Sequence, residues 1–97
     1  MTNYENGANF ERRIKRLYEK AGWVCVRSAG SRGPIDLICF REGEEIIFQM
    51  KTYAKWKERK ADFVALAKAH NKLAYYCYRE DKPPYKIKTE ILNHKLN

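Results

Sequence analysis

The sequence has no apolar stretch long enough to cross a membrane. A spanning helix needs about 18 or more consecutive apolar residues, and polar or charged residues interrupt every apolar run of this chain before that length. Residues 1–7 are polar and contain no apolar segment, so we expect no secretory signal there. We therefore expect a protein that has no membrane partner.

Cysteine is scarce, and its placement excludes two kinds of site. Cys25, Cys39 and Cys77 each stand alone inside an apolar run, and the chain has no Cys-x-x-Cys motif. An odd number of cysteines argues against a complete set of disulfides, and this spacing is not that of a zinc site. Buried free thiols are typical of reducing compartments. We therefore expect an intracellular, cytoplasmic protein with reduced cysteines.

Acidic residues are outnumbered by basic ones. The chain has 12 Asp and Glu against 20 Lys and Arg, a formal net charge of +8 over 97 residues. A positive field of this size favours a polyanionic partner such as nucleic acid, although a solvated basic surface is the alternative. The length predicts a single domain over residues 1–97, and the 44% hydrophobic content is enough for a small core.

The central part of the chain has the pattern of a β-hairpin. Residues 35–40 and 45–51 are apolar runs of strand length, and residues 41–44 between them form a charged turn that contains glycine. In an antiparallel pair of strands, the start of the first strand lies beside the end of the second. The residues at those two ends are therefore expected to be neighbours.

Polar residues interrupt the apolar pattern at those two ends. Asp36 lies near the start of the first run, and Gln49 and Lys51 lie near the end of the second. A buried charge is costly unless it is paired, so Asp36 has either a structural partner, Arg27 or Arg32, or a role in a site. A carboxylate, an amide oxygen and an ammonium group that converge are suited to holding a divalent metal against a phosphate.

The remaining pattern predicts an α/β fold. Glu11 lies at the edge of the apolar stripe of the first helix, where it is either a site residue or a plain surface glutamate. The expected order is α-β-β-β-α-β-β, a mixed central sheet with helices packed against it. The expected elements beside the hairpin are a helix from Asn6 or Asn9 to Ala21, a strand over 23–28, a helix over 61–71, and strands over 73–79 and 85–92.

Two segments have the composition of nucleic-acid contacts. Residues 52–60 carry four cations interleaved with Tyr53 and Trp56, which is typical of a surface that binds nucleic acid, although a solvated loop is the alternative. Residues 29–33 form a loop of small residues whose backbone can approach a ligand closely. The cations of the first segment are Lys55, Lys57, Arg59 and Lys60.

These motifs together resemble a known family. Pro34-Ile35-Asp36 followed by Gln49-Met50-Lys51 resembles the core of PD-(D/E)xK nucleases. The upstream motifs, in the same order, are similar to those of archaeal-type Holliday junction resolvases, and the resemblance covers about residues 7–52. These upstream motifs are Gly7, Glu11-Arg12, Gly22-Trp23, Arg27 and Gly30-Ser31-Arg32-Gly33.

The resemblance implies a restriction-endonuclease-like fold and an endonuclease that cleaves branched double-stranded DNA as a homodimer. It implies Mg²⁺ as the cofactor, with Mn²⁺ as a substitute. Lys51 would orient the attacking water and stabilise charge on the phosphate. The metal ligands carried over are Glu11, Asp36, Gln49 and the Met50 carbonyl, and the DNA contacts are Arg12, Arg27, Ser31 and Arg32.

Gln49 is a departure, because the family pattern has Asp or Glu at this position. An amide oxygen can coordinate a hard cation but brings no charge, so weaker metal binding is expected. The alternatives are a nuclease of the same fold with another DNA substrate, a catalytically silent DNA-binding module, and an unrelated basic interaction protein. The second helix and the strand over 73–78 are the predicted dimer interface.

Overall fold

A computed structural model describes residues 3–28, 33–51, 57–80 and 82–96. The side chains of residues 3–6 and 57–59 lie outside this description, as do the predicted DNA contacts Ser31, Arg32 and Lys55. The elements are α1 (Asn3–Lys20), β1 (Val24–Arg27), β2 (Leu37–Arg41), β3 (Glu44–Lys51), α2 (Lys57–Ala69), β4 (Leu73–Arg79) and β5 (Ile87–Asn93).

The five strands form one mixed sheet in the order β1-β2-β3-β4-β5. All neighbouring pairs are antiparallel except β3 and β4, which are parallel and are joined through α2. The predicted hairpin is confirmed, with Leu37 opposite Phe48 and Arg41 opposite Glu44. Gly43 in its turn has φ +74°, a conformation that residues with a Cβ rarely adopt.

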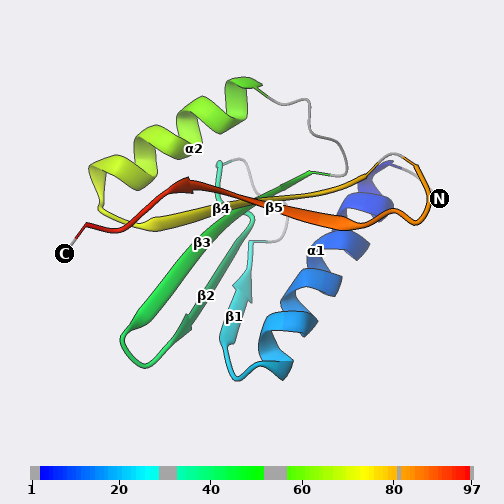
Figure 1. Ribbon diagram of the computed structural model, residues 1–97, viewed down its shortest axis with the longest axis horizontal. Coiled ribbons are helices and arrows are strands. Elements are labelled where there is room, and N and C mark those ends of the chain that lie inside the picture. Colours follow the sequence, from blue (N-terminus) through cyan, green and yellow to red (C-terminus); the bar gives the residue numbers. More distant parts are fainter. Residues whose placement is uncertain (1–2, 29–32, 52–56, 81, 97) are drawn as a thin grey trace.

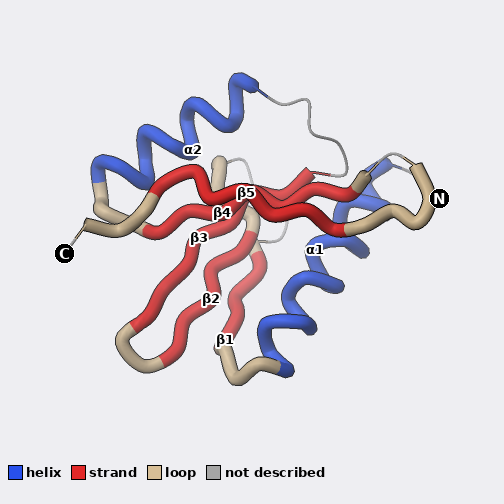
Figure 2. Tube along the Cα trace, viewed as in Figure 1, coloured by secondary structure: helices blue, strands red, loops and turns tan. Residues whose placement is uncertain are grey.

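The two helices cover opposite faces and different parts of this sheet (Figures 1 and 2). The helix α1 packs on β1, β2 and β3, whereas α2 packs on β3, β4 and β5. Phe10 and Ile14 of α1 join Phe48 in one buried cluster, and Phe63 of α2 joins Ile47 in the other. The side chains of β3 therefore alternate between two cores, which explains its nearly continuous burial.

The predicted helix boundaries differ from the observed ones. The first helix begins at Asn3, before the predicted caps, and the second begins at Lys57 rather than Ala61. Lys, Glu and Arg are good helix formers, but a turn made only of charged residues has no apolar periodicity that could reveal it. Within the described part of the chain, neither helix is long and apolar enough to cross a membrane.

The strand over 73–78, which was predicted to form the dimer interface together with the second helix, has little free surface in the described fold. This strand is β4, which lies between β3 and β5, and most of its surface is used inside the fold. Ala74, Tyr76 and Cys77 are buried there. Cys25, Cys39 and Cys77 are all buried free thiols, as predicted. The last strand runs from Ile87 to Asn93 at the sheet edge, close to its predicted bounds.

Candidate active site at the end of the central strands

The antiparallel pairing of β2 and β3 brings the predicted polar residues together. The backbone N–H of Asp36 donates to the carbonyl of Phe48 at 2.8 Å and so extends the pairing by one residue beyond Leu37. Asp36 therefore lies beside the last residues of β3, which include Gln49 and Lys51. The prediction that these two strand ends are neighbours is confirmed.

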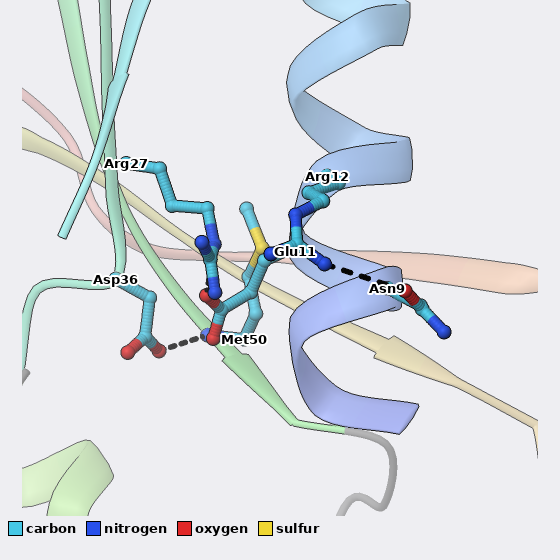
Figure 3. A network of polar contacts seen from close by, with 6 residues as sticks. All are labelled: Asn9, Glu11, Arg12, Arg27, Asp36 and Met50. Carbon is cyan, nitrogen blue, oxygen red and sulfur yellow. Dashed lines mark hydrogen bonds and ion pairs between the residues drawn. The ribbon is translucent and has the colours of Figure 1, made fainter. Parts of the chain in front are cut away.

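Asp36 is a buried carboxylate that the backbone of β3 holds in place. Its side chain is only 6% exposed, and its Oδ2 accepts a hydrogen bond from the Met50 N–H at 2.8 Å. Figure 3 shows the carboxylate pointing toward Met50, with Glu11 and Arg27 close by. The sequence also allowed Asp36 a structural partner, Arg27 or Arg32. Arg27 bonds to Glu11 instead, and Arg32 lies outside the described residues.

Glu11 belongs to this site and is not a plain surface residue. Its Oε1 lies 2.9 Å from Arg27 Nε, and both side chains are mostly buried. Burial raises the pKa of Glu11 and the charge of Asp36 raises it further, while Arg27 and Lys51 lower it. A bound cation would offset the effect of Asp36 on Glu11 and so favour the ionised form of Glu11.

The last residues of β3 divide between the two faces of the sheet. Met50 joins the cluster under α1, whereas Ile47 joins the cluster under α2, and Gln49 shares the face of Ile47 by strand alternation. Gln49 is fully buried at 0% exposure. Lys51 is partly exposed and ends β3 on the same face as Gln49, and its charge lowers the pKa of Glu11.

The donor set at this site fits a hard divalent cation. Two carboxylates, an amide oxygen and a backbone carbonyl are oxygen ligands of the kind that Mg²⁺ and Mn²⁺ prefer. No group of three His, Cys, Asp or Glu with metal-binding geometry occurs among the residues that the structure describes. The third side-chain ligand that the sequence predicts is Gln49, whose amide oxygen is a donor of the required kind.

A cationic pocket lies next to the carboxylates, on the exposed side of α1. It has a volume of about 330 Å³ and is lined by Arg12, Lys15, Arg16, Glu19 and Arg27. Arg12 and Arg27 were predicted as DNA contacts, but the two other cations were not. The sequence could have identified Lys15 and Arg16, because positions 12, 15, 16 and 19 have the spacing of one helix face.

Of the remaining predicted DNA contacts, Lys60 is the one whose side chain the structure describes, and it does not line this pocket. Lys60 is on α2, where its Nζ lies 2.9 Å from Glu90 Oε2 and 4.4 Å from the centre of the Tyr76 ring. Lys57 and Arg59 lie in the first turn of the same helix, and their side chains are outside the described residues. The described cations that line the pocket therefore come from α1 and β1, and Lys51 at the end of β3 adds a further positive charge that acts on Glu11.

The described fold is a restriction-endonuclease-like α/β fold. It has a mixed sheet with flanking helices and a buried acidic residue, Asp36, directly before β2. The solved structure of Hjc from Archaeoglobus fulgidus, described as a Holliday junction resolvase from an archaeal hyperthermophile, superposes with a TM-score of 0.69. The sequences are 20% identical, and the match covers 90% of this chain and 73% of that one.

The chain belongs to the archaeal Holliday junction resolvase (Hjc) family, whose profile matches residues 2–60. A curated relative is the crossover junction endodeoxyribonuclease Hjc of Methanocaldococcus jannaschii, with 54% identity over 54 residues. That alignment covers 56% of this chain and only 40% of the relative. The matched residues contain all of the carboxylates and cations that form the candidate site, from Glu11 to Lys51.

Proposed function

We propose that the chain is an endonuclease that binds branched DNA, Holliday junctions in particular, and cleaves it by metal-dependent phosphodiester hydrolysis. The observation that carries the proposal is the convergence of Glu11, Asp36 and Lys51 beside the cationic pocket. Family membership supports branched DNA as the substrate, because the relatives are named for activity on crossover and Holliday junctions.

Mg²⁺, with Mn²⁺ as a substitute, is the proposed cofactor. Glu11, Asp36, the Gln49 amide oxygen and the Met50 carbonyl would hold it. When bound, it would supply Lewis acidity toward the scissile phosphate and acidity to a coordinated water. The hydrogen bond from Met50 N–H to Asp36 Oδ2 fixes the carboxylate before any metal arrives, so little reorganisation is required.

Cationic side chains of the protein would position the attacking water and bind the phosphates. Lys51 would orient the attacking water and stabilise the negative charge that develops on the phosphate oxygens. Arg27 is held by Glu11 at the mouth of the pocket, where its remaining guanidinium N–H groups can donate to a phosphate. Arg12 and Arg16 extend the positive surface along α1, where they could contact further phosphates of the DNA.

A catalytically silent DNA-binding module is the second candidate. The observation in its favour is Gln49, a neutral residue that is fully buried where the family pattern has an acid. Cleavage assays with Mg²⁺ on four-way junction, duplex and flap DNA separate the candidates. Cleavage of the junction alone supports the resolvase, cleavage of duplex or flap supports another nuclease, and tight junction binding without cleavage supports the silent module.

We also propose that the protein acts as a homodimer, since two cuts on opposing strands of a junction need two related sites. The support is an apolar patch on β1 and β2. It lies on the face opposite α1, and α2 does not reach these two strands. Val24 is paired with Phe40 there, and Val26 is paired with Ile38. Val24, Val26 and Phe40 are 54%, 58% and 43% exposed, so they form a patch that a second copy would cover.

Sedimentation at micromolar concentration tests the dimer. The wild type should sediment as a dimer, and Val26→Lys should sediment as a monomer, because it places a charge inside the patch. Ile91→Lys is the matched control, since Ile91 is 50% exposed on β5 and lies outside the patch. A wild-type monomer with and without junction DNA, or equal disruption by both substitutions, would contradict this interface.

A further inference from the structure

Tyr76 is a buried polar residue whose position the proposed mechanism leaves without a role. It lies in β4 at 0% exposure and is among the largest fully buried side chains. The parallel register of β3 and β4 pairs it with Gln49, and the antiparallel register of β4 and β5 pairs it with Glu90. Paired residues project from the same face of a sheet. Gln49, Tyr76 and Glu90 therefore form a polar row across three strands.

Lys60 of α2 contacts two residues of this row, Tyr76 and Glu90. Its Nζ lies 4.4 Å from the centre of the Tyr76 ring, a cation–π contact, and 2.9 Å from Glu90 Oε2. The ring of Tyr78 lies 5.8 Å from that of Tyr76 at an angle of 37°. An ammonium, a carboxylate partner and a second ring thus surround the Tyr76 ring and restrict its rotamers.

The Tyr76 hydroxyl is neutral at neutral pH, as that of an ordinary tyrosine is. Burial raises the pKa of Tyr76 to about 12, with further contributions from the charges of Glu90, Tyr78 and Asp36. A neutral phenol both donates and accepts hydrogen bonds, and it adds no charge beside the carboxylates.

We propose that Tyr76, supported by Lys60 and Glu90, is a positioning residue that orients the Gln49 amide toward the metal. This inference rests on the proposed metal-dependent function. A carboxylate offers equivalent oxygens whichever way it turns, but an amide has an oxygen at one end and an NH₂ group at the other. A glutamine ligand therefore needs a neighbour that engages its nitrogen and leaves its oxygen for the metal. The Tyr76 hydroxyl oxygen, accepting from that NH₂ group, would do this.

Tyr76 and Glu90 lie beyond residues 2–60, which match the family profile. The C-terminal half of the chain thus supplies the support for the one ligand that departs from the family pattern. A sequence motif search confined to the matched residues would find Gln49 and miss the group that orients it.

Direct metal binding tests the proposal without relying on cleavage. Mn²⁺ affinity is measured by electron paramagnetic resonance on the full chain, and the Mg²⁺ midpoint of junction cleavage is measured beside it. Tyr76→Phe should weaken Mn²⁺ binding about tenfold, the usual effect of losing a group that orients a ligand. Lys60→Met, which removes the support of the ring, should act in the same direction with a smaller effect.

Two controls separate positioning from general stability. Tyr75→Phe is the matched control, because Tyr75 is the neighbouring residue on the opposite face, where its ring meets Phe48 at 5.6 Å; Mn²⁺ affinity should stay unchanged. In a Gln49→Glu background, Tyr76→Phe should have no effect, because a carboxylate needs no such orientation.

Three results would overturn the inference. They are unchanged Mn²⁺ affinity in Tyr76→Phe, an equal loss in Tyr75→Phe, or an equal loss in the Gln49→Glu background. A wild-type protein that binds no Mn²⁺ and cleaves no DNA would overturn the proposed function and this inference with it. If the wild type binds and cleaves while Tyr76→Phe behaves identically, only the inference about Tyr76 is lost.

Discussion

Arg27 Nε donates to Glu11 Oε1 at 2.9 Å, so a cation expected to bind DNA also holds a carboxylate expected to bind metal. The pair joins the end of β1 to α1 at the edge of the candidate active site. Because burial and Asp36 raise the pKa of Glu11 while Arg27 lowers it, the guanidinium helps to keep Glu11 ionised. The same residue would thus connect the proposed DNA contact with the charge of the proposed metal site.

Replacement of Arg27 should therefore shift the pH dependence of cleavage. In Arg27→Met the pKa of Glu11 rises further, because the group that lowers it is gone, so the acidic limb of the pH–rate profile should move to higher pH. Arg12→Met is the control, since Arg12 Nη1 contacts Asn9 and not Glu11. Both variants should weaken junction binding, but only Arg27→Met should move the profile. Identical profiles would show that Glu11 does not depend on Arg27.

The isosteric substitution Asp36→Asn should abolish cleavage while junction binding stays close to that of the wild type. It removes a ligand charge but no phosphate contact, and its amide oxygen can still accept the Met50 N–H bond. Mobility-shift and cleavage assays on the same junction give the two readouts, and thermal unfolding checks the fold. Full cleavage by this variant at ordinary Mg²⁺ would remove Asp36 from the site.

Substitutions at Gln49 should change the Mg²⁺ requirement. Gln49→Glu restores the charge of the family pattern, so the Mg²⁺ concentration for half-maximal cleavage should fall, although the maximal rate need not rise. Gln49→Ala removes the oxygen ligand and should raise that concentration. A Mg²⁺ titration of the three proteins decides the matter. Equal midpoints would leave Glu11, Asp36 and Lys51 to carry the chemistry without Gln49.

Arg16 should contribute to DNA binding through a phosphate contact. Each neutralised phosphate contributes about 0.9 to the slope of log affinity against log salt, so Arg16→Ala should reduce that slope by about this amount. Lys68→Ala is the control, because Lys68 is exposed on α2, away from the cationic pocket. Equal slopes in the wild type and Arg16→Ala would exclude the pocket as a DNA contact.

The local patterns of the chain predicted most of the fold. Alternating apolar runs identified the strands, and the glycine at position 43 identified the hairpin that aligns Asp36 with the end of β3. The start of α2 was missed because its first turn is made of charged residues, for which period-based reasoning has no signal. The parallel pairing of β3 with β4 is a long-range contact, and no local pattern specifies its register.

The candidate site was predictable where it depends on motif residues and unpredictable where it depends on side-chain contacts. Asp36, Gln49 and Lys51 were visible as polar interruptions of apolar strands. The Glu11–Arg27 pair and the Lys60–Glu90 pair join residues far apart in the sequence, and each could equally have faced solvent or DNA. The row from Gln49 to Glu90 follows from strand register alone, which only the assembled sheet reveals.

The parallel pairing of β3 and β4 also bears on how the protein is made. During synthesis the hairpin of β2 and β3 emerges before β4, so β3 at first has a free hydrogen-bonding edge that carries Ile46, Ile47 and Phe48. Such an edge is prone to pair with other chains, and closing it requires a slow, non-local contact across α2. The nascent N-terminal half is therefore the species most exposed to aggregation, and the residues from Leu73 to Arg79 protect it once they arrive.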